Sequence, residues 1–226
     1  MSTVWAFGDS MTAPFNGIPS EPSLYRMWLE RDAKDTSTFV AEHYGFQSKN
    51  KAVYGSSNAA IFHQFVQQLK NIESGDILIF GWTAISRYRI VENDKSMFGG
   101  LRWKNISQGI LNNPGFRCAD NTHVTKEVAQ QFLLNRCDFQ SLYEGEVNEW
   151  IDFINDWAKL KEVKVIHWSW CNSKSGGKQN LNLSFPVINY TDMTKESNGM
   201  IKDVHYGERG HYELSKDIIK YIDKLI

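Results

Sequence analysis

The residues best suited to chemistry in this chain are a serine near its start and an aspartate–histidine pair near its end. Ser10 follows the apolar, β-prone run Val4–Phe7 and the turn residues Gly8 and Asp9. An apolar run that stops at glycine and small polar residues is typical of a buried strand leaving a sheet. Open α/β sheets bind ligands in the turns that follow such strands. We expect the Asp9 side chain to hold this turn by bonding backbone N–H groups.

The second part of this pattern lies 193 or more residues further on, where Asp203 and His205 precede an amphipathic segment at 214–225. A neutral imidazole can take the proton of a serine hydroxyl, and a carboxylate can fix the tautomer of that imidazole. The pattern predicts Ser10 as nucleophile, His205 as base and Asp203 as the partner of His205. The alternative is an ordinary turn, because Gly, Asp and Ser are all common in turns.

The elements that must position these residues alternate between strand and helix patterns. Strands are expected over 4–7, 51–54, 76–81, 163–168 and 185–190, and helices over 24–31, 38–44, 59–72, 124–137, 142–160 and 214–225. This alternation predicts an α/β fold, a flavodoxin-like doubly wound sheet of about five mostly parallel strands with helices on both faces. Ser57 or Asn58 suits the N-cap of the helix at 59–72, and Gly45 suits the end of the helix at 38–44.

The chain of 226 residues is expected to form a single domain, 1–226, with a long insertion rich in aromatic residues, Gly and Asn at about 82–141. Loops of this length in a compact domain are usually binding elements or lids. No internal repeat or low-complexity segment divides the chain.

Three segments together resemble the SGNH hydrolases, also called GDSL-type esterases. Phe7–Ser10 is similar to the family's first block, Asn50–Asn58 to its second and the Asp203–His205 segment to its fifth. The resemblance implies that Ser10 is the nucleophile of an ester hydrolase and that His205 is its base, with Asp203 as partner. It also implies that the N–H of Gly55 helps to form an oxyanion hole, and that no cofactor takes part.

The chain departs from the family pattern in two places. The third block usually reads Gly-x-Asn-Asp and its asparagine completes the oxyanion hole, whereas Thr83 stands at that position here. The Thr83 hydroxyl or the Asn58 amide is the expected substitute. The fifth block usually reads Asp-x-x-His, whereas Asp203 and His205 are separated by one residue. His211, at the start of the last helix, matches a position that the family often uses for packing.

Composition excludes several function classes. The formal net charge is −1 and the basic residues are scattered, so no nucleic-acid partner is expected. No apolar run is long enough to span a bilayer, and no signal peptide is recognised, so we expect no membrane partner and a cytoplasmic location. Cys118, Cys137 and Cys171 show no zinc or disulfide spacing, and no metal site is expected.

The sequence thus predicts a serine esterase that acts on O-acyl esters of a small molecule or glycan, with O-acetyl carbohydrate as the family-based substrate class. Trp82, Trp103, Trp168 and Trp170 follow or flank expected strand ends, where their rings would suit stacking on a sugar or an acyl group. Core packing is the commoner fate of tryptophan. Two alternatives stay open: transfer of the acyl group to an alcohol, and a catalytically weak or inactive protein of the same fold that acts as a glycan-binding or structural component. The oligomeric state is not predicted.

Overall fold

The computed structural model describes residues 1–18, 20–84, 87–93, 101–107, 140–170, 181–184 and 192–224. Their main feature is a parallel sheet of five strands in the order β4-β1-β5-β8-β9. The strands are β1 (Thr3–Gly8), β4 (Gln47–Asn50), β5 (Ile77–Trp82), β8 (Lys164–Ser169) and β9 (Leu183–Ser184). With β1 lying between β4 and β5, the order is that of a flavodoxin-like sheet. The predicted α/β class and sheet type are confirmed.

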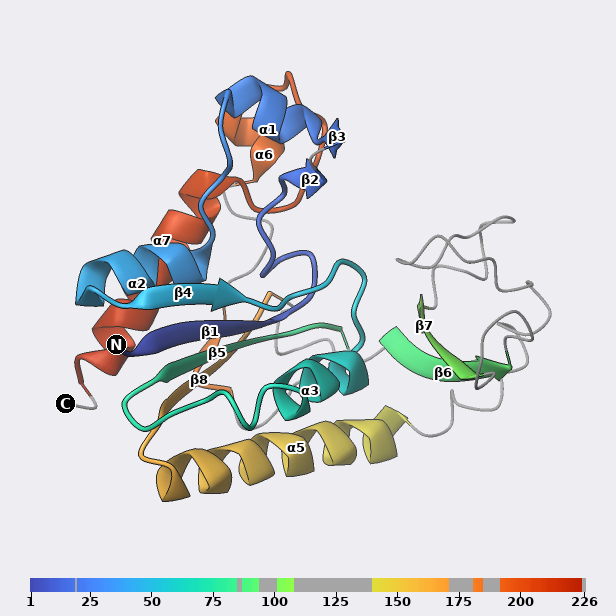
Figure 1. Ribbon diagram of the computed structural model, residues 1–226. Helices are drawn as coiled ribbons and strands as arrows, with labels where there is room; N and C mark the ends of the chain where they lie inside the picture. The colour runs from blue at the N-terminus through green and yellow to red at the C-terminus, as the bar shows by residue number, and fades with distance from the viewer. Residues whose placement is uncertain are drawn as a thin grey trace.

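Helices cover both faces of this sheet (Figure 1). One face carries α2 (Thr36–Tyr44) and α7 (Glu208–Ile222), and the other carries α3 (Asn58–Val66) and α5 (Gln140–Leu160). The helix caps predicted from the sequence are confirmed for α3 and α2. Ser57 caps α3 by accepting from the N–H of Ala60, and Gly45 ends α2 in the left-handed region with φ +68°.

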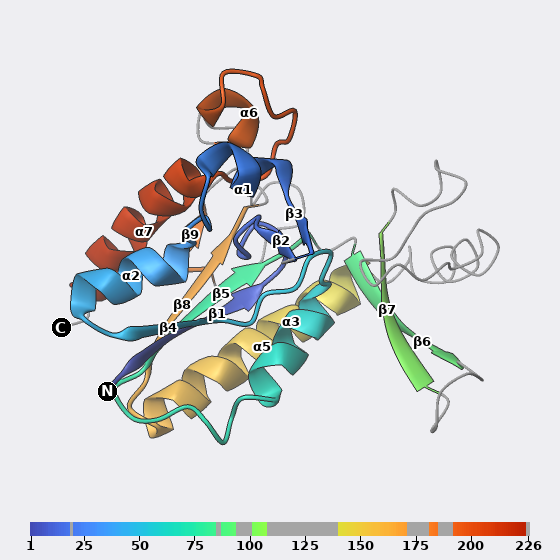
Figure 2. The same ribbon diagram turned by 45° about the horizontal axis from the view of Figure 1, so that its top comes forward.

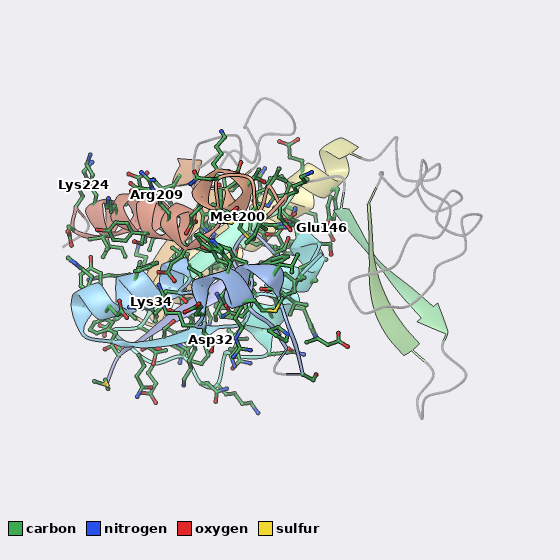
Figure 3. The ribbon with its side chains drawn as sticks, turned by 90° about the horizontal axis from the view of Figure 1, so that it is seen from above. Asp32, Lys34, Glu146, Met200, Arg209 and Lys224 are labelled. Atoms are coloured by element: carbon green, nitrogen blue, oxygen red, sulfur yellow. The ribbon has the colours of Figure 1, made fainter. Side chains whose placement is uncertain are left out.

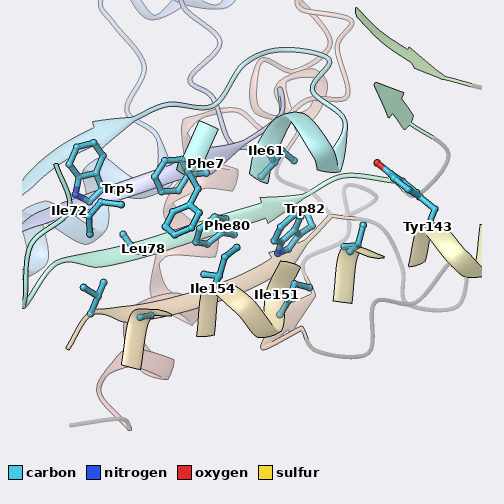
Figure 4. Close-up of a cluster of buried hydrophobic side chains, with 14 residues drawn as sticks. Trp5, Phe7, Ile61, Ile72, Leu78, Phe80, Trp82, Tyr143, Ile151 and Ile154 are labelled. Atoms are coloured by element: carbon cyan, nitrogen blue, oxygen red, sulfur yellow. The ribbon is translucent and has the colours of Figure 1, made fainter. Parts of the chain in front are cut away.

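The alternation of side chains along the strands fills two cores, and Figure 4 shows the one between the sheet and the helices α3 and α5. Along β1, Trp5 and Phe7 point toward α3 and α5, whereas Val4 points toward α2 and α7. The same division holds along β5, where Leu78 and Phe80 face one core and the isoleucines at 77 and 79 face the other. Five residues of α5 at helical spacing close the first core: Tyr143, Val147, Ile151, Ile154 and Ala158.

The second strand of the chain differs from the prediction. It was expected over 51–54, but β4 covers Gln47–Asn50, an exposed polar segment at the edge of the sheet. An edge strand beside solvent needs no apolar face, so its pattern gives little signal. The chain still follows β1 beyond β4, because the N–H groups of Lys51 and Val53 donate to the carbonyls of Ala6 and Gly8 at 2.8 and 3.1 Å.

The insertion expected at about 82–141 contains an antiparallel hairpin formed by β6 (Arg87–Asn93) and β7 (Leu101–Ser107). In both orientations this hairpin lies to one side of the main sheet (Figure 2), and β6 approaches α3. The expected helix at 124–137, the expected strand at 185–190 and the three cysteines lie outside the described residues.

A small third layer lies beyond the N-terminal end of α7 (Figure 1). It consists of α1 (Leu24–Leu29), α6 (Met193–Glu196) and the short pair β2 (Gly17–Ile18) and β3 (Glu21–Pro22). Its own core contains Tyr25, Ala33, Met193 and Ile201, with Phe15 and Leu29 packed against them. Among the described residues, no helix has both the length and the apolar composition needed to cross a bilayer.

Candidate active site

The carboxyl ends of β1 and β5 each carry a glycine, and together these glycines leave room for a side chain from the following turn. Gly8 and Gly81 are paired across the two strands, and the side chain of Thr12 packs against both. A Cβ atom would lie 2.1 Å from the Thr12 hydroxyl oxygen at Gly8 and 2.0 Å from it at Gly81. Only glycine leaves room for this contact. The chain after β1 therefore folds back over the end of the sheet, and Ser10 lies in that turn.

The Ser10 turn is held by the buried carboxylate of Asp9. One carboxylate oxygen accepts from the backbone N–H of Met11 at 2.9 Å, and the other accepts from the indole N–H of Trp170 at 3.0 Å. The Asp9 carbonyl accepts from the N–H groups of Thr12 and Ala13, both at 3.0 Å. The prediction that Asp9 stabilises the turn through its side chain is confirmed, and the bond from Trp170 links the turn to the end of β8.

Three side chains predicted to act together lie in one hydrogen-bonded row. The Ser10 hydroxyl oxygen is 2.9 Å from Nε2 of His205, although the two residues are 195 positions apart. Nδ1 of His205 is 2.6 Å from Oδ1 of Asp203. A carboxylate accepts from Nδ1–H, which leaves Nε2 as the acceptor for the Ser10 hydroxyl. Ser10 is 7% exposed, and the imidazole and carboxylate are about one-third exposed.

The short spacing of Asp203 and His205 is accommodated by a tight turn. Oδ1 of Asp203 accepts from the backbone N–H of His205 at 2.8 Å as well as from its ring. Such a side-chain-to-backbone bond two residues on is the usual Asx turn. The start of α6 fixes the same loop, since Met193 N–H donates to the His205 carbonyl at 2.9 Å and Thr194 N–H donates to the Asp203 carbonyl at 3.0 Å.

The first turn of α7, directly after this loop, is capped by distant side chains. Gly207 provides no side-chain cap. Instead the Tyr25 hydroxyl accepts from the N–H of Glu208 and donates to the Glu196 carboxylate at 2.7 Å, and that carboxylate accepts from the N–H of Arg209 at 3.3 Å. Burial is the main cause that raises the pKa of both Tyr25 and Glu196. The loop that carries His205 is thus anchored on both sides.

A bidentate ion pair joins the chain before α2 to the same turn of α7. The Arg31 guanidinium donates to both oxygens of Glu208 at 2.7 Å, and the backbone N–H of Lys34 donates at 2.9 Å. The hydrogen bonds from Arg31 lower the pKa of the Glu208 carboxyl. Figure 3 views this end of the molecule, with Lys34 before α2 and Arg209 at the start of α7.

The other predicted oxyanion residues lie at neighbouring strand ends. Gly55 follows the extension of β4 beside Gly8 and has φ +72°, a conformation that favours glycine. Asn58 and Thr83 are fully buried and bonded to each other: the Asn58 amide accepts from Thr83 N–H at 2.9 Å and donates to the Thr83 carbonyl at 3.2 Å. The structure thus places Asn58 on the Thr83 backbone, and neither residue has exposed side-chain surface.

The tryptophans proposed as stacking platforms are mostly part of the fold. Trp82 and Trp168 are fully buried, and Figure 4 shows Trp82 within its cluster of buried side chains. The Trp82 indole N–H donates to Nδ1 of His167 at 3.0 Å. The expectation that these two rings are available to a substrate is wrong. Trp82 lies in the core under α5, and Trp168 lies in the core on the opposite face of the sheet, where it stacks on Tyr206. Trp170 is engaged with Asp9, and the side chain of Trp103 lies outside the described residues.

Two aromatic residues beside the row were missed by the sequence analysis. The ring of Phe15 stacks on the His205 imidazole, with ring centroids 5.1 Å apart and planes inclined by 29°. Tyr54 packs its ring against Phe15 at 5.5 Å and an angle of 65°, and its hydroxyl donates to the Pro14 carbonyl. Both residues lie in irregular segments, where the sequence offers no periodic pattern that would identify them.

His211 is a buried packing residue of α7. It is buried, and its Nδ1 lies 3.0 Å from the Thr36 hydroxyl. Burial lowers its pKa to about 4, against the opposing effects of the Asp35 charge and the Ala13 carbonyl. His211 is therefore neutral near pH 7 and packs between α2 and α7. Within the part of the chain that the structure describes, no cluster of three or more His, Cys, Asp or Glu residues could hold a metal ion.

Comparison with known proteins gives little further information. No family model and no curated protein sequence matches this chain. One matching solved structure is that of a protein from Desulfitobacterium hafniense DCB-2 assigned to the lipolytic G-D-S-L family. It shares 10% sequence identity, covers 97% of this chain and 99% of its own chain, and has a TM-score of 0.35. That score is too low to carry an argument, so the fold rests on its own sheet order and the site on its own geometry.

Proposed function

We propose that this protein is a serine ester hydrolase of the SGNH type, with Ser10 as nucleophile, His205 as general base and acid, and Asp203 as the partner of His205. The observation that carries the proposal is the hydrogen-bonded row Ser10–His205–Asp203 at the carboxyl edge of the parallel sheet. In acyl transfer this order of hydroxyl, imidazole and carboxylate is the arrangement that activates a serine.

In the proposed reaction the Ser10 oxygen attacks the ester carbonyl carbon while its proton passes to Nε2 of His205. The tetrahedral intermediate collapses as the bond to the leaving alcohol breaks, and His205 returns the proton to that alcohol oxygen. Water then attacks the acyl-serine with His205 as base, which releases the carboxylic acid and restores Ser10. Throughout, Asp203 accepts from Nδ1–H and stabilises the imidazolium that forms in each half-reaction.

The negative charge on the carbonyl oxygen requires donors close to Ser10. The backbone N–H groups of Ser10 and Gly55 are proposed for this role, because both lie in turns at the ends of neighbouring strands. A third donor from Thr83 or Asn58 stays a prediction. The loss of one such donor typically lowers kcat by about a hundredfold or more, so a site with only two would be a slow catalyst.

The proposed substrate is an O-acyl ester with a short acyl group, and an O-acetyl carbohydrate is the class suggested by the SGNH resemblance. With Trp82 and Trp168 buried, the described aromatic surface beside the site includes Tyr54, which is 37% exposed, and the partly covered Phe15. This surface suits the flat face of a sugar or a small acyl group. Transfer to an alcohol instead of water would use the same residues.

A second candidate function is that of a glycan-binding or structural component with little turnover. The observation that favours it is the engagement of Asn58 with the Thr83 backbone, which leaves the family's third oxyanion donor without an obvious replacement. In such a protein Ser10 would still contact an ester, but the barrier to attack would stay high.

Hydrolysis of 4-nitrophenyl acetate and butyrate by the wild-type protein and by Ser10→Ala tests the proposal. The expected result is turnover by the wild type that falls to background in Ser10→Ala, with unchanged circular dichroism. Ser37→Ala, at another buried serine, is the matched control and should retain activity. Equal activity of wild type and Ser10→Ala would exclude Ser10 as nucleophile, and no activity in the wild type would favour the binding function.

A further inference from the structure

The stacking of Phe15 on His205 has a chemical consequence for the proposed reaction. The two ring centroids are 5.1 Å apart and the planes are inclined by 29°, so the face of the benzene ring lies over the imidazole. We propose that Phe15 is a positioning residue: its ring holds the imidazole in the plane that reaches both Ser10 and Asp203, and it stabilises the imidazolium formed when Ser10 gives up its proton. This inference rests on the proposed function.

The backbone around Phe15 is fixed on both sides, so the ring is a rigid support. The Phe15 carbonyl accepts from the Ser23 hydroxyl. The preceding Pro14 carbonyl accepts from the N–H of Asn16 at 2.9 Å and from the Tyr54 hydroxyl. The amide of Asn16 forms two bonds with the backbone of Ala33, at 2.7 and 3.3 Å. Phe15 therefore connects the small third layer to the imidazole.

The neighbours of Phe15 also link the base to the oxyanion turn. Tyr54 contacts the edge of the Phe15 ring at 5.5 Å and immediately precedes Gly55 in the chain. A shift of the Phe15 ring would thus move the His205 imidazole and the Gly55 turn together. Phe15 and Tyr54 thus form a continuous contact between the base and the segment that carries the proposed oxyanion donor.

Two physical roles of Phe15 predict opposite changes when its ring is removed. The face of an aromatic ring carries partial negative charge and attracts a cation, so loss of the ring should disfavour imidazolium and lower the pKa of His205. If Phe15 acted only as an apolar cover, its loss would admit water, favour imidazolium and raise that pKa. Replacement of Phe15 by an aliphatic residue therefore separates the two roles by sign.

The experiment is an NMR pH titration of the His205 ring proton, assigned by comparison with His205→Gln, in wild type, Phe15→Leu and Phe15→Tyr. In Phe15→Leu the pKa of His205 should fall by about 0.5, and in Phe15→Tyr it should return toward the wild-type value. Phe39→Leu, at a half-buried ring that packs on Tyr212 of α7, is the matched control and should leave the pKa unchanged. Phe15→Met replaces Phe15→Leu if the latter does not fold.

The titratable groups on the elements around this imidazole are unaltered in all variants: Asp203 on its own loop, Asp9 on the Ser10 turn, Tyr54 before Gly55, Asp192 at the start of α6 and Glu208 on α7. An unchanged or raised pKa of His205 in Phe15→Leu would overturn the inference. Because the titration needs no substrate, it can succeed even if the wild type proves inactive. If the wild type is active, the acid limb of kcat/KM should move to lower pH in Phe15→Leu.

Discussion

Asn58 and Thr83 hold each other by two hydrogen bonds that join the start of α3 to the end of β5. Oδ1 of Asn58 accepts from Thr83 N–H at 2.9 Å, and Nδ2 donates to the Thr83 carbonyl at 3.2 Å. Both residues are fully buried. This pair fixes the turn after β5 against the segment that carries Gly55, so the two sides of the proposed oxyanion site are tied together by a side chain instead of by sheet pairing.

Asn58→Ala should lower the free energy of unfolding by about 2–4 kcal/mol. The substitution would leave the buried N–H and carbonyl of Thr83 without the hydrogen bonds that they form with the Asn58 amide. Denaturant unfolding measures this difference. Asn71→Ala, at an exposed asparagine whose amide donates only to Gln68 among its described contacts, is the control and should change stability by less than about 0.5 kcal/mol. Similar small effects of both substitutions would show that the pair does not hold these turns.

The two glycines that admit Thr12 should be intolerant of a methyl group. In Gly8→Ala the new Cβ would lie 2.5 Å from the Cβ of Thr12, and the resulting overpacking should cost about 1–3 kcal/mol. Gly145→Ala is the matched control, since Gly145 lies inside α5 with no atom near its would-be Cβ. That substitution should instead stabilise the protein by about 0.5–1 kcal/mol. Thermal or denaturant unfolding of both variants checks the opposite signs.

The stability of the protein should fall in acid because of His211. Its pKa is lowered from 6.5 to about 4, mainly by burial, so the folded state binds fewer protons than the unfolded state. The corresponding stability is present above pH 6.5 and is lost as the pH falls toward 4, a loss on the order of 3 kcal/mol for this group.

His211→Gln removes this titration, so the difference in unfolding free energy between wild type and variant should change over that pH range. His43→Gln, at an exposed histidine of α2, is the control. A constant difference between wild type and His211→Gln from pH 7 to pH 4 would contradict the buried, neutral state of His211.

The sequence predicted the elements whose patterns are set by burial. Strands β1 and β5 contain continuous apolar runs and β8 is rich in apolar residues, and α5 and α7 show helical spacing because one face of each meets the sheet. The edge strand β4 was predicted at the wrong position, because its side chains face solvent and show no apolar pattern. The small layer formed by α1 and α6 was not predicted as a unit, since its contacts join residues about 170 positions apart, such as Tyr25 and Glu196.

The site, too, contains residues that a local pattern predicts and residues that only the packing of distant segments brings together. Ser10, Asp203 and His205 could be chosen from the sequence because their types and turn contexts suit one chemistry, and the structure brings them within hydrogen-bonding distance. The role of Asn58 as a bond to the Thr83 backbone could not be predicted, because it depends on how far two loops approach. The Phe15 stack was missed for the same reason, and the burial of Trp82 and Trp168 depends on the packing of whole faces.

The most direct test of an activated Ser10 is covalent labelling by a fluorophosphonate probe, which needs no knowledge of the natural substrate. We predict that the folded wild-type protein is labelled at Ser10, that Ser10→Ala is not labelled, and that His205→Gln reacts much more slowly because the base is missing. Denatured wild-type protein is the control and should not react. A folded wild-type protein that the probe does not label, or one labelled equally well after His205→Gln, would contradict the proposed Ser10–His205 mechanism.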